Sequence, residues 1–200
     1  SGDKSGDFSL SAGTFDTASG GNYAVTVDGN FTVSAGVVEA RGAVIAVAGN
    51  VSIVNSSGAF VGGTSTLSLL GSGTVVNPHV GSAFYDVIQA NGITTTISSD
   101  LHISNTFTTG DGTSVVTDDN AAAVRTVYLA GALVNGGATW NSQDSLVLEF
   151  SGISFVGGDF GDVKLFFSNA AETVLTGAVT TTVDVQVRGA DSGPMISESV

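Results

Sequence analysis

The chain has 200 residues, of which 42% are hydrophobic and 12% are charged, and its 18 acidic and five basic side chains give a net charge of −13. This composition excludes disorder and indicates one folded domain with a surface of neutral polar residues. The shortage of Lys and Arg excludes a basic face, so we expect no nucleic-acid partner. No apolar run approaches the ~20 residues of a spanning helix, so no membrane insertion is expected.

Both ends of the chain are polar. Residues 1–7 are expected to form a flexible lead or linker, residues 8–190 the folded domain, and residues 191–200 a polar tail. The chain starts at Ser1 without a signal-peptide pattern, which indicates a processed product or an excised fragment.

Short segments in which apolar and small polar residues alternate recur after Phe8, as is typical of strands with one buried face. In chain order they are 8–10, 23–27, 31–33, 51–53, 67–69, 101–103 and 183–187. Strong helix formers are scarce, and only residues 120–125 suggest a single helical turn. We therefore predict an all-β fold, with turns built by Gly, Asn, Asp and Ser.

A short phrase, an apolar residue two before a glycine and another two after it, returns along the chain. It occurs at 27–31, 47–51, 129–133 and 175–179, with degenerate copies starting at Leu69, Ile97 and Phe150, and the steps between copies are uneven. Recurrence on this scale is typical of solenoids, in which small repeats bury a core only by stacking. We predict a single parallel β-helix, or β-solenoid, with irregular coils of about 20–30 residues and the glycine at one corner of each. The alternative is an antiparallel β-sandwich, which would have strands at ~8–12-residue spacing joined by hairpins.

Residues 23–53, and residues 84–88 followed by 94–103, resemble the degenerate β-helical repeats of large secreted bacterial and archaeal surface proteins and adhesins. The likeness covers roughly residues 20 to 185. It implies a β-helix and an extracellular or cell-surface location. The function that we expect is structural and non-enzymatic, as a subunit or segment of a fibre or adhesin.

A solenoid has two open ends with unpaired backbone groups. The terminal strands carry Phe8, Leu10 and Phe15 at one end and Val183, Val185 and Val187 at the other. We expect these strands to pair between copies, end to end, so that the protein associates with itself into a fibre or filament.

Two acidic segments suit a hard cation. Asp111, Asp118 and Asp119 form one set and Asp159 and Asp162 the other, and both are candidate calcium ligands. The competing interpretation is that both segments are solvated turns. No cofactor is required by the scaffold interpretation, and calcium would be an optional ligand of a surface-layer or matrix protein.

Three sequons make Asn30, Asn50 and Asn55 candidate glycosylation sites. Asn30 and Asn50 also lie on the repeated phrase, where an asparagine is favoured because it tolerates left-handed backbone and turns. Stacked asparagines at equivalent corners would form a side-chain ladder along the solenoid.

Residues for catalysis are few, and we predict that the chain is not an enzyme. His102 is expected to be a solvated side chain on the outer face of a strand. The alternative function is binding or degradation of polysaccharides, possible partners being cell-surface glycans, through outward carboxylates of adjacent coils. The candidate carboxylates are Asp86, Asp100, Asp144, Glu149 and Asp184.

The pair Phe166-Phe167 must send one ring out of the core, because adjacent strand residues point to opposite faces. The other phenylalanines are expected to stack inside the coils.

Overall fold

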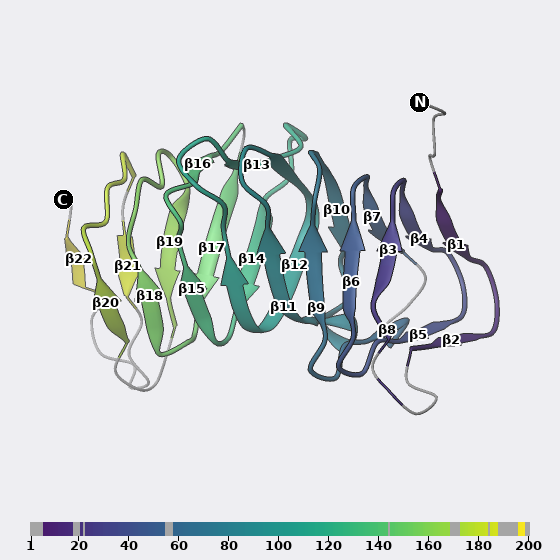
Figure 1. Ribbon diagram of the computed structural model, residues 1–200. Coiled ribbons are helices and arrows are strands. Elements are labelled where there is room, and N and C mark those ends of the chain that lie inside the picture. Colours follow the sequence, from purple (N-terminus) through teal and green to yellow (C-terminus); the bar gives the residue numbers. More distant parts are fainter. Residues whose placement is uncertain are drawn as a thin grey trace.

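The coils follow one another along a single axis from the N-terminal to the C-terminal end (Figure 1). The computed structural model describes residues 6–17, 21, 23–54, 58–143, 145–168, 173–183, 185–187 and 196–198. They form a parallel β-solenoid of about eight turns. Only one strand pair in this part of the chain is antiparallel, β21 (Val185–Val187) with β22 (Ile196–Glu198), so the β-helix prediction is confirmed and the sandwich is excluded.

Each coil contributes to three columns of stacked strands. The first column holds β1 (Phe8–Leu10), β4 (Phe31–Val33), β7 (Val51–Ile53), β10 (Gly73–Asn77), the start of β12 (Thr94–Thr108), β13 (Val115–Asp118) and β16 (Thr139–Asn141). The second holds β2 (Thr14–Asp16), β5 (Val37–Glu39) and β8 (Phe60–Val61), and continues past a 3-10 turn, η1 (Val80–Ser82), with the middle of β12, β14 (Arg125–Leu129), β17 (Leu146–Phe150), β19 (Lys164–Phe167) and β21. The third holds β3 (Val25–Val27), β6 (Val44–Val47), β9 (Thr66–Leu69), β11 (Phe84–Gln89), the end of β12, β15 (Ala132–Val134), β18 (Ser154–Val156) and β20 (Val174–Thr176).

The register gives the length of a coil. In the third column Val25 pairs with Ile45 and Ile45 with Leu67, so the first coils lie at the short end of the expected range. The coil between Phe107 and its partner Leu133 is longer. Parallel pairing in register places like residues over like, so one buried position per strand becomes a continuous row through the core.

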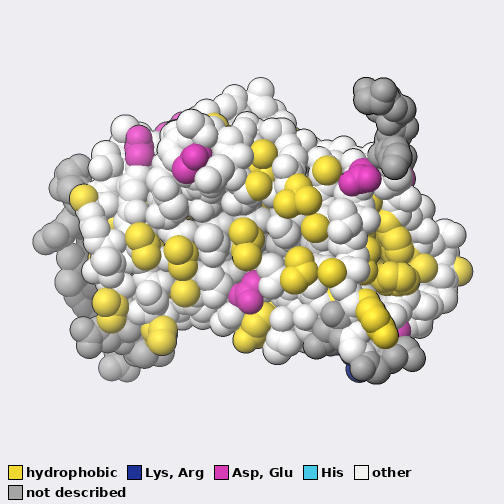
Figure 2. All heavy atoms as spheres, viewed as in Figure 1, with side chains coloured by type: hydrophobic (Ala, Val, Ile, Leu, Met, Phe, Trp, Pro, Cys, Tyr) yellow, Lys and Arg dark blue, Asp and Glu magenta, His cyan; other side chains and the backbone are white. Residues whose placement is uncertain are grey.

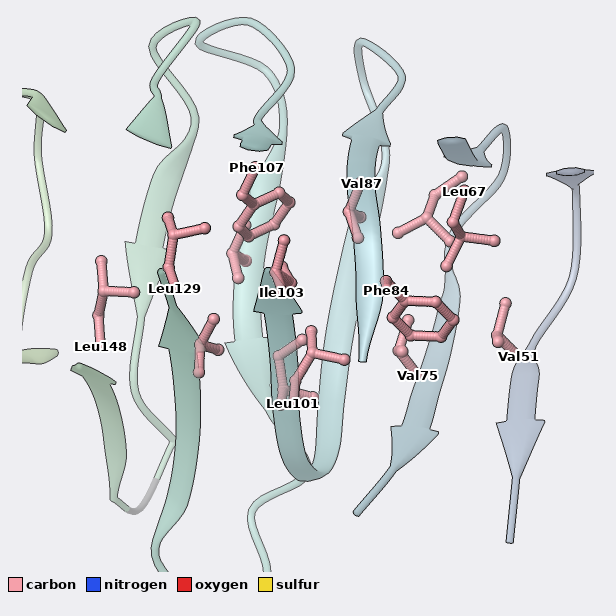
Figure 3. Close-up of a cluster of buried hydrophobic side chains, with 14 of the residues drawn as sticks. Val51, Leu67, Val75, Phe84, Val87, Leu101, Ile103, Phe107, Leu129 and Leu148 are labelled. Atoms are coloured by element: carbon pink, nitrogen blue, oxygen red, sulfur yellow. The ribbon is translucent and has the colours of Figure 1, made fainter. Parts of the chain in front are cut away.

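The core is a stack of aliphatic and aromatic side chains, part of which is drawn in Figure 3. Phe31, Phe107, Phe150 and Phe155 are at most 1% exposed, and the Phe8 ring stacks on Phe31 at a centroid distance of 4.7 Å. The expectation of internal phenylalanine stacking is confirmed. Phe167 is buried and Phe166 lies half-buried on the outer face of β19, as adjacent strand positions require.

The repeated phrase marks corners, but not one corner. Its glycine joins the third column to the first at Gly29, Gly49 and Gly71, and the second column to the third at Gly131 and Gly152. The prediction of one stacked corner is therefore wrong. Because the phrase moves from one corner to another along the chain, its longest steps exceed the length of a single coil. The change of corner is invisible in the sequence because each corner sets the same demand, a small residue between two inward-facing apolar positions.

Close stacking, and not an unusual backbone angle, explains the glycine at this corner. A Cβ atom on Gly49 would lie 2.6 Å from the carbonyl oxygen of Gly29 and 2.7 Å from its carbon, closer than real Cβ atoms come. Gly49 is not among the described glycines with positive φ. The corner thus needs a residue without a side chain where one coil passes over the next.

Two local expectations are wrong. Residues 120–125 form no helical turn; Asn120 adopts a positive φ of 52° and Arg125 begins strand β14, because the stack pairs this strand with β17. Asn30 and Asn50 do not use left-handed backbone, since Arg41 and Asn120 are the described non-glycine residues with positive φ. Figure 2 shows a face on which charged side chains are few and hydrophobic side chains are scattered among backbone and other side chains.

Candidate functional site

The predicted calcium ligands lie in turns and accept hydrogen bonds from nearby groups. Oδ1 of Asp111 accepts from the backbone N–H of Thr113 at 3.0 Å and from its hydroxyl at 2.5 Å. These hydrogen bonds lower the pKa of the Asp111 carboxyl, because they favour its charged form.

Asp118 and Asp119 are adjacent but serve different partners. Asp118 is buried and accepts from the backbone N–H groups of Gln143 and Ser145 at 2.6 and 2.9 Å, which joins one coil to the next. Asp119 receives two hydrogen bonds from the guanidinium of Arg125, at 3.1 and 3.0 Å, and this pairing lowers its pKa.

Asp159 and Asp162 lie at another corner. Oδ1 of Asp159 accepts from the backbone of Gly161 at 3.0 Å, and Oδ1 of Asp162 accepts from Ser142 at 2.7 Å. No group of three or more His, Asp or Glu side chains that could hold a metal ion is found in the described part of the chain. The structure therefore does not bring the five predicted ligands together, and the calcium site stays a prediction.

The asparagine ladder is present on the corner between the third and first columns. Oδ1 of Asp7 accepts from the backbone N–H of Asn30 at 2.7 Å, and Oδ1 of Asn30 accepts from the backbone and side-chain N–H of Asn50, each at 2.9 Å. Oδ1 of Asn50 then accepts from the backbone of Thr74 at 2.8 Å. The predicted ladder is confirmed, and the asparagines are explained by contacts between coils. Glycosylation of Asn30 and Asn50 stays a prediction, and Asn55 lies outside the described residues.

The two ends of the solenoid differ. At the N-terminal end β1, β2 and β3 each pair with the following coil on one side, and no other strand of the described chain pairs with them. Phe8, Leu10 and Phe15 of the predicted assembly set are only half-buried there. At the other end β21, which carries Val185 and Val187, pairs with β19 on one side and with β22 on the other.

Val183 precedes β21. It lines a hollow with the outer residues of β19, beside the last coil. The sequence therefore located a strand at Val185–Val187, but β22, which follows it and covers its outer edge, was missed because its residues lie in the stretch expected to be a polar tail.

Two hollows flank a row of outward residues on the outer side wall formed by the second column. One outward residue per coil forms a row of His102, Tyr128, Glu149, Phe166 and Gln186, which are register partners from β12 to β21. All five are half-buried. We call this row and the hollows beside it the side-wall groove.

The first hollow of the side-wall groove has a volume of about 270 Å³. One side of the hollow is formed by the large side chains of His102, Tyr128 and Glu149. Its floor is formed by Ser104, Ala130 and Ser151, which are small, exposed and located at the turn toward the third column. The His102 and Tyr128 rings are stacked at 4.5 Å with planes 4° apart. A separate, larger hollow of about 470 Å³ lies on the other side of the row, lined by Lys164, Phe166 and Gln186 among others.

His102 is not the solvated side chain expected from the sequence. Stacking on Tyr128 buries part of the ring, and this burial lowers the pKa of His102. The imidazole is therefore neutral at pH 7. The sequence placed His102 correctly on the outer face but gave no sign that Tyr128, one coil further on, lies beside it.

The carboxylates considered for polysaccharide cleavage are spread over different walls. Asp86 belongs to the third column, where it accepts from the side chain of Asn105 at 2.7 Å and the backbone of Thr106 at 3.0 Å. Oδ1 of Asp100 accepts from the backbone of Thr126 at 3.0 Å. Of this set, Glu149 lies in the side-wall groove, whereas Asp144 and Asp184 lie outside the described residues.

Comparison of the chain with protein-family models, with curated proteins and with solved structures gave no match. In the described part of the chain, no helix is long and apolar enough to cross a membrane.

Proposed function

We propose that this protein is a structural, non-enzymatic segment of an extracellular surface fibre that extends by joining copies end to end. The observation that carries the proposal is the N-terminal edge, where three strands of one coil have a neighbour on one side only within the described chain. An unpaired strand edge is a template for another strand. Contacts between unlike ends do not close, so they produce a filament.

The chemistry of the N-terminal edge supports pairing with a copy of the same fold. The half-buried rings of Phe8 and Phe15 lie 4.9 Å apart, edge to face, at the end of the core. A further coil placed over them would bury this apolar surface as each internal coil does for its neighbour. The side chain of Asp7 already continues the asparagine ladder onto this coil.

The C-terminal end offers an edge for the proposed contact in its first column. Strand β20 and the short bridge between Asp159 and Thr180 end the third and first columns in the described chain. Strand β22 covers the second column. In the proposed contact β1 therefore pairs with the segment around Thr180 of the next copy, while Val185 and Val187 stay inside their own subunit.

Negative-stain electron microscopy and sedimentation velocity at rising protein concentration test the proposal. We expect rods that lengthen with concentration. The variant Ser9→Pro removes the one backbone N–H in β1 that points away from β4, because Phe8 and Leu10 use their own backbone groups toward that strand. It should prevent assembly, and Ser9→Ala, which keeps the N–H, should assemble like the parent. A strictly monomeric protein at all concentrations would contradict the proposal.

A further inference from the structure

The shape of the side-wall groove fits a ligand that lies parallel to the solenoid axis. Its floor residues Ser104, Ala130 and Ser151 come from consecutive coils, as do the bulky residues beside them. Neighbouring strands are separated by ~4.8 Å, so a chain-like ligand meets one new floor residue and one new side chain at each such step. This spacing is close to the length of one sugar ring in an extended polysaccharide.

The groove combines flat apolar walls with hydrogen-bonding groups, which is the chemistry of a sugar-binding surface. The stacked His102 and Tyr128 rings hold each other in place, so little side-chain freedom remains to be lost on binding. Tyr128 carries a hydroxyl, Glu149 a carboxylate and Gln186 an amide, and these can donate to or accept from sugar hydroxyls. The electron-rich π faces of aromatic rings suit the C–H groups of sugars.

Charge argues for an uncharged ligand. Among the residues that the structure describes, the two hollows contain one acid, Glu149, and one base, Lys164, and His102 is neutral at pH 7 because burial lowers its pKa. A polyanionic ligand would be repelled by a protein with a net charge of −13. A polycationic ligand could pair only with Glu149, the one described carboxylate in the groove.

A peptide strand is a poorer occupant than a sugar chain. Peptides bind sheet proteins by adding a strand to an open edge. The strands that line the first hollow, β12, β14 and β17, already pair with a strand on each side, so their backbone groups are used.

From these observations we infer that the side-wall groove binds a neutral, extended oligosaccharide along the solenoid axis. The inference is independent of end-to-end assembly, because the groove lies on the side of the solenoid and uses no terminal strand edge.

Isothermal titration calorimetry of the whole chain with cellohexaose, xylohexaose and chitohexaose tests the inference, with a heparin hexasaccharide as the charged comparison. At least one neutral hexasaccharide should bind and the heparin fragment should not. Tyr128→Ala should weaken binding by at least roughly tenfold, since aromatic anchors dominate such contacts. Tyr23→Ala is the matched control, because Tyr23 is 65% exposed and lines neither hollow, and it should bind as the parent does.

A second variant protects the test against loss of the fold. Ala130→Trp adds a ring to the exposed floor without removing a buried group, so it should block the groove in a protein with an unchanged circular dichroism spectrum. The inference is overturned if no neutral hexasaccharide binds, if heparin alone binds, or if neither variant changes the affinity. It is also overturned if Tyr128→Ala abolishes a dimer of the parent protein and no sugar binds, since the occupant is then a second copy.

Discussion

Substitution of Gly49 by alanine tests the stacking of coils at the corner between the third and first columns. The new Cβ would meet the carbonyl oxygen and carbon of Gly29 at 2.6 and 2.7 Å and Oδ1 of Asn30 at 2.9 Å. Neither carbonyl atom belongs to a flexible side chain. The backbone N–H of Gly49 also donates to the Gly29 carbonyl at 2.9 Å, so moving the coils apart would weaken that hydrogen bond.

The expected cost follows from three effects. Overpacking against a rigid neighbour costs about 1–3 kcal/mol. Weakening the backbone hydrogen bond costs about 1 kcal/mol more, and the loss of glycine's freedom in the unfolded chain returns about 0.4–1 kcal/mol. We therefore expect Gly49→Ala to lower the free energy of unfolding by about 1–3.6 kcal/mol, which for 200 residues is a fall in Tm of about 2–14 °C.

Urea titration followed by circular dichroism measures the effect, provided that the slope of the transition is the same for parent and variant. Gly112→Ala is the matched control, because its Cβ would lie 3.7 Å from the nearest atom, the Gly137 carbonyl oxygen, and its backbone does not have positive φ. It should not lower stability, and the lost freedom of the unfolded chain should raise it by about 0.4–1 kcal/mol. Equal, small effects of the two substitutions would refute close coil stacking as the reason for the glycine.

Three further predictions concern side chains between coils. Asn50→Ala, which breaks the exposed ladder on both sides, should destabilise the fold by about 1 kcal/mol in the same urea titration, whereas an unchanged midpoint would contradict a structural role for the ladder. Pairing lowers the pKa of Asp119, so the stability that Arg125 contributes is present above the ordinary carboxyl pKa and is lost as pH falls through the lowered one. Arg125→Ala should therefore cost about 1 kcal/mol at pH 7 and nothing once the pH lies below the lowered pKa of Asp119, and a cost independent of pH would contradict the pairing. His102 should titrate by NMR below the ordinary imidazole pKa, and Tyr128→Ala should raise its pKa because the ring becomes solvated; no change would mean that the stack does not bury it.

The solenoid and its inward rows could be predicted because they depend on local patterns. The alternation of apolar and polar residues in segments such as 31–33 and 51–53 shows which face of each strand is buried. The recurring glycine shows that many coils need a residue without a side chain at a corner. The corner at which each phrase lies could not be predicted. A phrase at Val27 and a phrase at Leu129 have the same form, and only the register with neighbouring coils shows that they belong to different corners.

The side-wall groove could not be predicted for a related reason. The sequence distance between successive members of its row is not constant, because the turns between strands differ in length from one coil to the next. Outward positions carry no apolar pattern that fixes their phase, so Tyr128 and Glu149 look like ordinary surface residues. In the loops around Asp111 and Asp159 the sequence has a clear acidic pattern that suggests a cation site. In the structure, hydrogen bonds within the turns account for these aspartates.

The short distance along the chain between paired residues has a consequence for how such a chain can change in evolution. Strand pairings span about a tenth of the chain, a relative contact order near ~0.1, so each coil interacts with its immediate neighbours and with little else. Removing or duplicating one whole coil leaves every remaining pairing possible, whereas a short insertion within a strand shifts its apolar face. Lineages of this protein should therefore differ in length by whole coils, and each added coil would lengthen a groove on the side wall by one step.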